Sequence, residues 1–257
     1  MNPPYDIICI GAGPTGLACA IEAKRAGLRP LVIDKGVLCN SLYRYPVNMV
    51  FFTTPELLEI GDLPFVSAAE KPTRVEALKY YRKCVEHYDL ELRLGETVTR
   101  VDGGDGSFRV HTRVTENNPA IKTRDGGAGA ASDDPVVERQ KGVSSRESHG
   151  DQELSRATKS TPLLAHEKVL PAVHVFALTG YHPDFDFLRQ LGVKLDLKTN
   201  KPALDAQTLE SNVGGLYLAG VVIGGNHTSE IFIENGRFHG KQIIAALTGT
   251  TLAVAQP

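Results

Sequence analysis

Three glycines near the start of the chain have the spacing of a turn that can hold a diphosphate. Gly11, Gly13 and Gly16 follow an apolar run typical of a strand and open a segment typical of a helix. The first glycine permits a tight turn, the second lets the backbone approach a diphosphate, and the third lets helix and strand pack closely. N–H groups at the start of the helix would then face the phosphates.

An acidic residue completes this pattern. Asp34 ends the next expected strand, roughly twenty residues after the glycines, where a carboxylate can accept hydrogen bonds from ribose hydroxyls. Negative charge at this position disfavours a 2′-phosphate. The pattern therefore predicts that the chain binds FAD or NAD rather than NADP.

A second glycine-rich stretch lies near the C-terminus. Residues 214–225 have the pattern of a buried strand that ends in glycines just before the last expected helix. These glycines either let the backbone approach a ligand or mark an ordinary core strand with a turn, and the local pattern fits both. Gly236 and Gly240 share one face of that helix, which indicates close packing against another backbone or a cofactor.

The elements that would position these residues form a mixed α/β pattern. Thr73 and Glu76 have the spacing of a capping box at the start of a helix. We expect strands at 6–10, 30–34, 90–94, 98–101, 108–112, 174–178 and 215–219, a strand pair within 193–204, and helices ending near 26, 88 and 247, the last of them beginning at 230.

Composition divides the chain into three parts. Residues 115–165 contain no aromatic side chain and few bulky apolar ones, so this segment is predicted to be a disordered linker. It is too short for a further nucleotide-binding domain, which needs roughly 100 residues. Residues 1–114 and 166–257 are expected to assemble into one α/β domain, a Rossmann-like parallel sheet with helices and a three-stranded β-meander-type insertion.

Charge and cysteine content restrict the function classes. The 257 residues carry a formal net charge of −2 and no basic patch, which argues against a nucleic-acid partner. No apolar stretch reaches the roughly 20 residues that span a bilayer, and no signal peptide is recognisable, so we expect a cytoplasmic protein without a membrane partner. Cys9, Cys19, Cys39 and Cys84 form no C-x-x-C pair, and no spacing indicates a metal site or identifies a catalytic residue.

Several blocks of sequence resemble one family of flavoproteins. They are residues 10–17, 31–35, 40–46, 51–54, 58–62 and 71–74 near the start, and 176–184, 216–222 and 231–240 near the end. On these blocks the chain resembles the YpdA-type bacillithiol disulfide reductases, relatives of thioredoxin reductase with two dinucleotide-binding domains. The resemblance covers both ends of the chain and skips the middle.

The resemblance implies an FAD-binding domain whose flavin takes electrons from NAD(P)H and passes them to a small-molecule or protein disulfide. It implies that the ADP half of FAD lies against Gly11, Gly13, Pro14, Thr15, Gly16, Asp34 and Lys35. For the remainder of the cofactor it implies contacts from Ser41, Tyr43, Thr53, Val98, Gly180, Gly220, Val221 and Ile231.

Three departures from the family pattern bear on activity. No second G-x-G-x-x-G occurs within 115–165, where two-domain relatives carry their NAD(P)H site, so NAD(P)H has no binding motif here. Thr15 stands where the YpdA-type pattern has a cysteine, and Cys39 is either a substitute thiol or a buried apolar residue. Val221 replaces an aspartate of many relatives, although YpdA-type sequences often share the apolar residue.

These observations leave several functions open. The first is an FAD-dependent disulfide or quinone-type oxidoreductase that takes electrons from weakly bound NAD(P)H or from a protein. The second is an FAD-binding remnant without turnover. An internal deletion or a reading-frame shift in the gene would explain the break in composition. An NAD-dependent dehydrogenase would explain the first motif alone. Loss of a domain would uncover one face, so association into a homo-oligomer is a further expectation.

Overall fold

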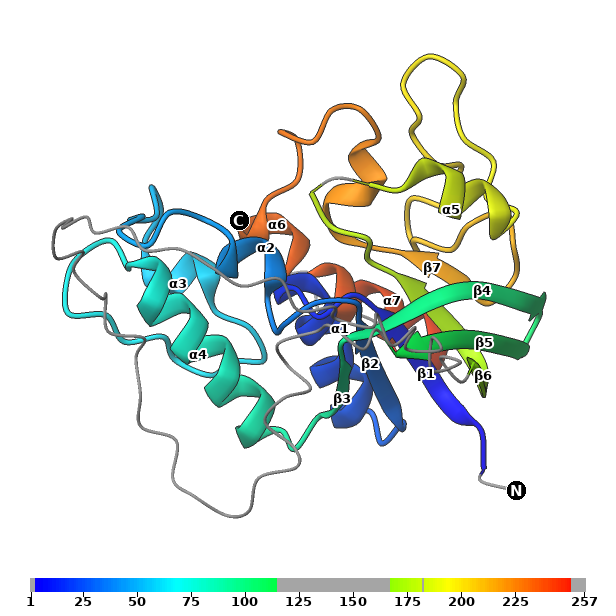
Figure 1. Cartoon of the computed structure of the whole chain (residues 1–257), viewed down its shortest axis with the longest axis horizontal. Coiled ribbons are helices and arrows are strands. Elements are labelled where there is room, and N and C mark those ends of the chain that lie inside the picture. The colour runs from blue at the N-terminus through cyan, green and yellow to red at the C-terminus, as the bar shows by residue number, and fades with distance from the viewer. Residues whose placement is uncertain (1–2, 115–166, 182, 251–257) are drawn as a thin grey trace, which may run out of the picture.

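The structure is a computed structural model that describes residues 3–114, 167–181 and 183–250 (Figure 1). The expected linker at 115–165 lies outside the described residues. The elements in chain order are β1 (Tyr5–Ile10), α1 (Pro14–Arg25), β2 (Pro30–Asp34), α2 (Asn40–Tyr43), α3 (Pro55–Leu58), α4 (Arg74–His87), β3 (Glu91–Leu94), β4 (Glu96–Gly104), β5 (Ser107–Val114), β6 (Glu167–Ala177), α5 (Phe185–Gln190), β7 (Leu216–Leu218), the 3₁₀ helix η1 (Gly220–Gly224), α6 (Ile233–Gly236) and α7 (His239–Thr248).

One mixed sheet joins the two ends of the chain. Its strand order is β3-β2-β1-β6-β5-β4, and β7 also pairs with β6. Strands β1, β2 and β3 run parallel because helices cross between them, and β6 and β7 extend this parallel half. The expected Rossmann-like sheet built from both chain ends is confirmed.

Strands β4, β5 and β6 form the expected antiparallel meander. The third strand of this meander is unusually long, since β6 pairs with β5 through its first half and with β1 and β7 through its second half. Arg113 at the end of β5 is paired with Glu167 at the start of β6. The end of β5 and the start of β6 therefore lie side by side at one edge of the meander.

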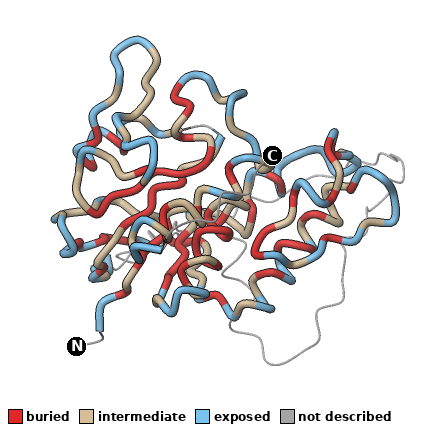
Figure 2. Tube along the Cα trace, turned by 180° about the vertical axis from the view of Figure 1, so that it is seen from behind, coloured by how far each residue is buried: buried red, intermediate tan, exposed pale blue. Residues whose placement is uncertain are grey.

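The core follows the central strands and the helices that cover them (Figure 2). Leu17 and Ile21 of α1 are fully buried against the sheet. Helix α7 packs on α1 so closely that a Cβ at Gly240 would lie 2.8 Å from the Cα of Cys19. This close approach confirms that the glycine permits backbone packing. Within the described ranges no helix is long and apolar enough to cross a bilayer.

A capping box begins α4, as the sequence predicts. The Thr73 hydroxyl accepts a hydrogen bond from the Glu76 backbone N–H at 3.2 Å, and the Glu76 carboxylate accepts the Thr73 N–H at 2.8 Å. The Glu76 carboxylate also accepts hydrogen bonds from the Thr73 hydroxyl and from the Ala68 N–H. These hydrogen bonds, those from Thr73 first, lower the pKa of Glu76 to about 2.

We expect Glu76→Gln to destabilise the protein by roughly 1 kcal/mol at pH 7, because both carboxylate oxygens accept hydrogen bonds and the amide can replace only one of them, without the charge. Because the folded pKa of Glu76 is depressed, its stabilisation is present above pH 4.5 and is lost as the pH falls towards about 2. Urea unfolding of the wild type at several pH values should show this loss in that window, and the variant should show less of it. Glu86→Gln, at an exposed position of the same helix, is the matched control. Equal acid sensitivity in wild type and Glu76→Gln would contradict the assignment.

Two expected elements differ in the structure. The last helix is not continuous from 230 to 247 but is divided into α6 and α7. It also starts later than expected, because the Asn235 side chain accepts the Phe232 N–H at 2.8 Å and caps the helix at that point. The expected strand pair within 193–204 is absent from the described strands, where only the isolated bridge Leu195–Pro202 forms. Side-chain hydrogen bonds from backbone N–H groups to Asp196 turn the chain instead.

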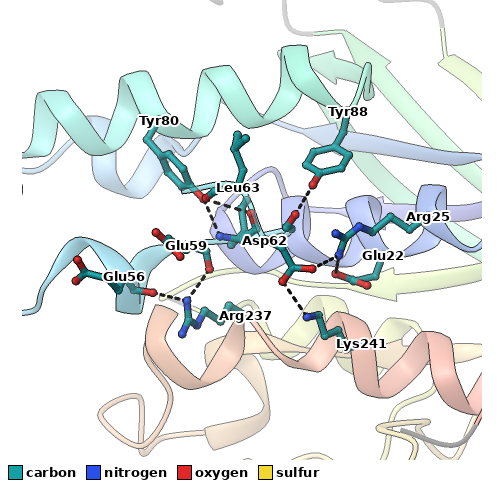
Figure 3. Close-up of polar contacts among 12 residues, drawn as sticks. Glu22, Arg25, Glu56, Glu59, Asp62, Leu63, Tyr80, Tyr88, Arg237 and Lys241 are labelled. Carbon is teal, nitrogen blue, oxygen red and sulfur yellow. Dashed lines mark hydrogen bonds and ion pairs between the residues drawn. The ribbon is translucent and has the colours of Figure 1, made fainter. Parts of the chain in front are cut away.

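A polar network ties the break between α6 and α7 to the N-terminal segment (Figure 3). Arg237 donates from one nitrogen, Nη1, to the carbonyl oxygens of Glu56 at 2.6 Å and Glu59 at 2.9 Å. Nearby, Asp62 accepts from Arg25 at 2.8 Å and Lys241 at 3.1 Å. Residues about 180 positions apart in the sequence thus contact each other and hold the N-terminal and C-terminal segments together.

We expect Arg237→Met to cost about 2 kcal/mol of unfolding free energy, because two backbone carbonyls lose a charged donor. Lys241→Met is the control, since its ion pair is solvent-exposed and such pairs contribute under about 1 kcal/mol. Chemical denaturation of both variants measures the difference. Equal costs would show that the Arg237 contacts are no stronger than a surface ion pair.

Candidate functional site

A cavity of about 550 Å³ opens at the carboxyl ends of the parallel strands. Ile10 ends β1, Asp34 ends β2, Leu178 follows β6 and Ala219 follows β7, and all four line it. In open α/β sheets this edge, where the strand order reverses, is the usual place for a ligand. Its volume lies within the range of small-molecule sites.

Each of the three glycines in the first turn is required for a different local reason. Gly11 has φ +125°, and a Cβ there would lie 2.3 Å from the Leu178 carbonyl oxygen. A Cβ on Gly16 would lie 2.0 Å from the Gly11 carbonyl oxygen. Gly13 differs, because no described atom lies within 4 Å of its Cβ position and the residue lines the cavity. Gly11 and Gly16 therefore serve packing, whereas Gly13 leaves room in the cavity.

Asp34 holds the glycine turn as well as lining the cavity. Its Oδ2 accepts a hydrogen bond from the Ala12 N–H at 2.8 Å, and its Oδ1 accepts from the Gly36 N–H at 2.7 Å. Each carboxylate oxygen has a further lone pair that can accept from a ligand hydroxyl. The sequence pattern predicted that Asp34 would bind a ligand hydroxyl, but not that it would hold the glycine turn.

Thr15 packs between the two glycine-rich regions. A Cβ on Gly236 would lie 3.0 Å from its Oγ1, and a Cβ on Gly220 would lie 3.2 Å from the same atom. The small residues of the C-terminal segment thus make room for the first turn of α1. This contact joins the glycines at both ends of the chain into one wall of the cavity.

All the expected site residues line the cavity except Tyr43 and Thr53. The Tyr43 side chain is 56% exposed, and Thr53 is buried away from the cavity lining. Several lining residues were not predicted as site residues, among them Glu96, Thr179 and Phe232. Their positions depend on how segments distant in the sequence come together.

Two buried polar groups in the lining have unusual surroundings. The Thr179 hydroxyl is buried and has no hydrogen-bond partner among the described residues. Glu96 is 5% exposed, accepts a short hydrogen bond from the Thr112 hydroxyl and lies 3.7 Å from Arg93. A buried hydroxyl without a hydrogen-bond partner is unfavourable, so a ligand that forms a hydrogen bond with the Thr179 hydroxyl would bind more tightly.

None of the four cysteines presents a reactive thiolate. All are buried and free. Cys39 lines the cavity but is only 1% exposed, and burial raises its thiol pKa well above the ordinary value. Burial likewise raises the pKa of Cys19 to about 12 and that of Cys84 to about 11. These thiols are protonated near neutral pH, as expected for buried apolar residues. In the described part of the chain no cluster of ligating side chains could hold a metal ion.

Exposed aromatic side chains border the cavity. Phe52 is 69% exposed and Phe232 is 43% exposed, and their ring centroids lie 6.0 Å apart in an edge-to-face arrangement. Tyr45 and Tyr181 also line the cavity and are partly exposed. A large apolar area on the surface is typical of a binding site.

Comparison with known proteins gives consistent matches across most of the chain. A family model described as pyridine nucleotide-disulphide oxidoreductase matches residues 8–119 and 146–220. Bacilliredoxin reductase Bdr of Bacillus subtilis (strain 168) is 31% identical over 313 aligned positions, which cover 93% of this chain and 96% of the relative. Since the alignment is longer than the 257-residue chain, it contains gaps where the relative has additional residues.

Solved structures of two reductases are similar to this chain over almost its whole length. Bacillithiol disulfide reductase Bdr (YpdA) from Bacillus cereus superposes with a TM-score of 0.68 at 25% identity, covering 97% of this chain and 100% of that chain. The protein of the same description from Staphylococcus aureus has a TM-score of 0.66 at 24% identity, with 98% and 100% covered. The arrangement of strands and helices around the cavity is therefore that of a known fold.

Proposed function

Because this chain belongs to the pyridine nucleotide-disulphide oxidoreductase family, we propose that it is an FAD-dependent oxidoreductase that transfers electrons to a disulfide and uses NAD(P)H poorly. The observation that carries the proposal is the cavity, which both chain ends build around the glycine turn. The relatives named as bacillithiol disulfide reductase and bacilliredoxin reductase support the substrate class.

The lining residues fit FAD on three counts. Gly13 leaves open space where a diphosphate needs close approach to the backbone. Asp34 retains acceptor capacity for ribose hydroxyls. The unpartnered Thr179 hydroxyl can bond to a polar group of the ligand. Residues from both ends of the chain, including Ser41, Gly220 and others of the expected set, would contact the rest of the cofactor.

When bound, FAD would supply two-electron chemistry, and two electrons with two protons convert a disulfide into two thiols. The protein's own residues bind and orient the cofactor. Thr15 cannot replace a thiol as a sulfur nucleophile, and the buried Cys39 is protonated. Both observations favour reduction of the substrate at the flavin without a protein thiol as an intermediate carrier.

Poor use of NAD(P)H is supported by the length of the chain compared with that of its relative and by the sequence of residues 115–165. The alignment with the Bacillus subtilis relative requires gaps in this chain, and residues 115–165 contain no second G-x-G-x-x-G. The same observations favour a second candidate function, an FAD-binding remnant without turnover. In either case FAD binding is expected, so the two candidates differ in reduction and turnover.

The experiment is the visible spectrum of the purified protein with FAD, recorded anaerobically before and after NADPH, NADH or dithionite. Slow bleaching by NAD(P)H together with turnover of a low-molecular-weight disulfide would support the oxidoreductase. Bleaching by dithionite alone, with no turnover of any disulfide, would support the remnant. A colourless protein that does not take up added FAD would overturn both.

We also propose that the protein self-associates. Tyr43, Val47, Val50 and Phe52 are each more than half exposed within one short segment, and such surfaces often mediate assembly. Light scattering across a concentration series tests this, and a monomer at all concentrations would exclude it. Cytoplasmic location remains a prediction from the sequence.

A further inference from the structure

Gly220 occupies a turn that is held from two sides. It follows β7, has φ +77° and lines the cavity. On one side the Thr15 side chain fills the space next to its Cα, where a Cβ would lie 3.2 Å from Oγ1. On the other side its backbone N–H donates to Nδ1 of His239 at 2.9 Å. His239 is the first residue of α7 and does not itself line the cavity.

The contact requires His239 to be neutral, because a protonated Nδ1 would present a hydrogen to the Gly220 N–H. Burial, with no charged partner contributing, lowers the pKa of His239. The titratable groups around His239 do not counteract this lowering of its pKa. On α1 the thiol of Cys19 is protonated, and on α7 the adjacent Lys241 is paired with Asp62 at 3.1 Å.

Helix α7 is also fixed in place, so the imidazole cannot easily retreat from the turn. A Cβ on Gly240, next to His239, would lie 2.8 Å from the Cα of Cys19, which leaves no space between α7 and α1. Arg237 anchors the preceding residues to the Glu56 and Glu59 carbonyls. Loss of the acceptor at His239 would therefore displace the Gly220 turn, because α7 cannot move to compensate.

We infer that His239 is a positioning residue that holds the Gly220 turn against the cofactor cavity, so that protonation of His239 weakens FAD binding. The inference rests on the proposed function and adds to it a pH dependence that originates outside the cavity. FAD affinity should be constant at and above neutral pH and should fall below the ordinary histidine pKa of 6.5.

The test measures FAD affinity of the apoprotein by flavin fluorescence between pH 8.0 and 5.5. We expect the affinity of the wild type for FAD to fall at least about twofold but less than about tenfold over this range, because the lowered pKa of His239 leaves the imidazole only partly protonated at pH 5.5. His239→Asn, whose Oδ1 can accept the Gly220 N–H but does not titrate, should bind FAD at pH 8.0 within about threefold of the wild type and lose the pH response. His239→Leu should bind about tenfold more weakly at every pH. His174→Asn, a half-buried histidine outside the cavity lining, should keep the wild-type response.

A wild type without pH dependence, or a His239→Asn variant as weak as His239→Leu, would overturn the inference. Thermal unfolding of each apoprotein at pH 8.0 identifies a variant that fails to fold. Nitrogen NMR of the His239 imidazole in the apoprotein gives a separate readout, in which Nδ1 should be unprotonated at pH 8.0, and a proton on it would also refute the inference. If no FAD binds at any pH the proposed function fails, and the NMR result still decides the role of His239.

Discussion

Replacing Gly13 by aspartate is expected to lower FAD affinity at least about a hundredfold while leaving the protein folded. Gly13 has φ −78° and ψ 174°, a conformation that any residue adopts, and no described atom lies within 4 Å of its Cβ position. A carboxylate there would enter the cavity next to the proposed diphosphate. Like charges about 4 Å apart repel by roughly 4 kcal/mol near a protein surface, and 1.4 kcal/mol is tenfold in affinity.

Titration of the apoprotein with FAD measures the effect, and thermal unfolding checks the fold. Gly13→Ala should weaken binding by a smaller factor, because it adds bulk without charge. Gly224→Ala is matched to it, since Gly224 also has no described atom within 4 Å of its Cβ position and lies outside the cavity lining. Wild-type affinity in Gly13→Asp would place the diphosphate elsewhere and remove the main support for the proposed cofactor site.

Replacing Gly240 by alanine is expected to destabilise the protein by about 1–3 kcal/mol, the usual cost of overpacking. Helix propensity alone predicts the opposite, a gain of about 1 kcal/mol. The added Cβ would lie 2.8 Å from the Cα and 2.9 Å from the backbone nitrogen of Cys19, and backbone atoms cannot move aside as a flexible side chain can. The sign of the effect therefore separates packing from propensity.

Differential scanning calorimetry should show a lower Tm for Gly240→Ala, by roughly 2–4 °C for each kcal/mol. Ala246→Gly, at an exposed position of α7, measures the propensity contribution in the same helix. A higher Tm in Gly240→Ala would mean that α1 and α7 can separate at little cost. It would also weaken the inference that His239 is fixed in place.

The βαβ unit and the capping box could be predicted because their signals are local. Strand, glycine turn, helix and Asp34 follow one another within 34 residues, and each has a distinct residue pattern. Thr73 and Glu76 are three residues apart and cap the helix as expected. The residue pattern also indicated that Gly236 and Gly240 make close contacts, although not which contacts.

The parts that could not be predicted depend on interactions between distant segments. The place where α6 and α7 meet is held by Arg237, whose guanidinium donates to carbonyl groups nearly 180 residues earlier in the chain. The burial of Thr179 and Glu96 in the cavity wall likewise requires the assembled sheet, in which segments from both ends of the chain meet. Tyr43 was expected at the site from the family resemblance, but its side chain is exposed and does not line the cavity. No local pattern states which way a loop side chain points.

The pairing of Arg113 with Glu167 places the end of β5 beside the start of β6, so the two strands are joined as neighbours in an antiparallel pair. The entropy of closing such a connection grows only logarithmically, by about 0.6 kcal/mol for each doubling. A folded module can therefore replace a short turn between these two strands with only a small additional loss of sheet stability. This junction is therefore a rational point for grafting a foreign domain onto the protein.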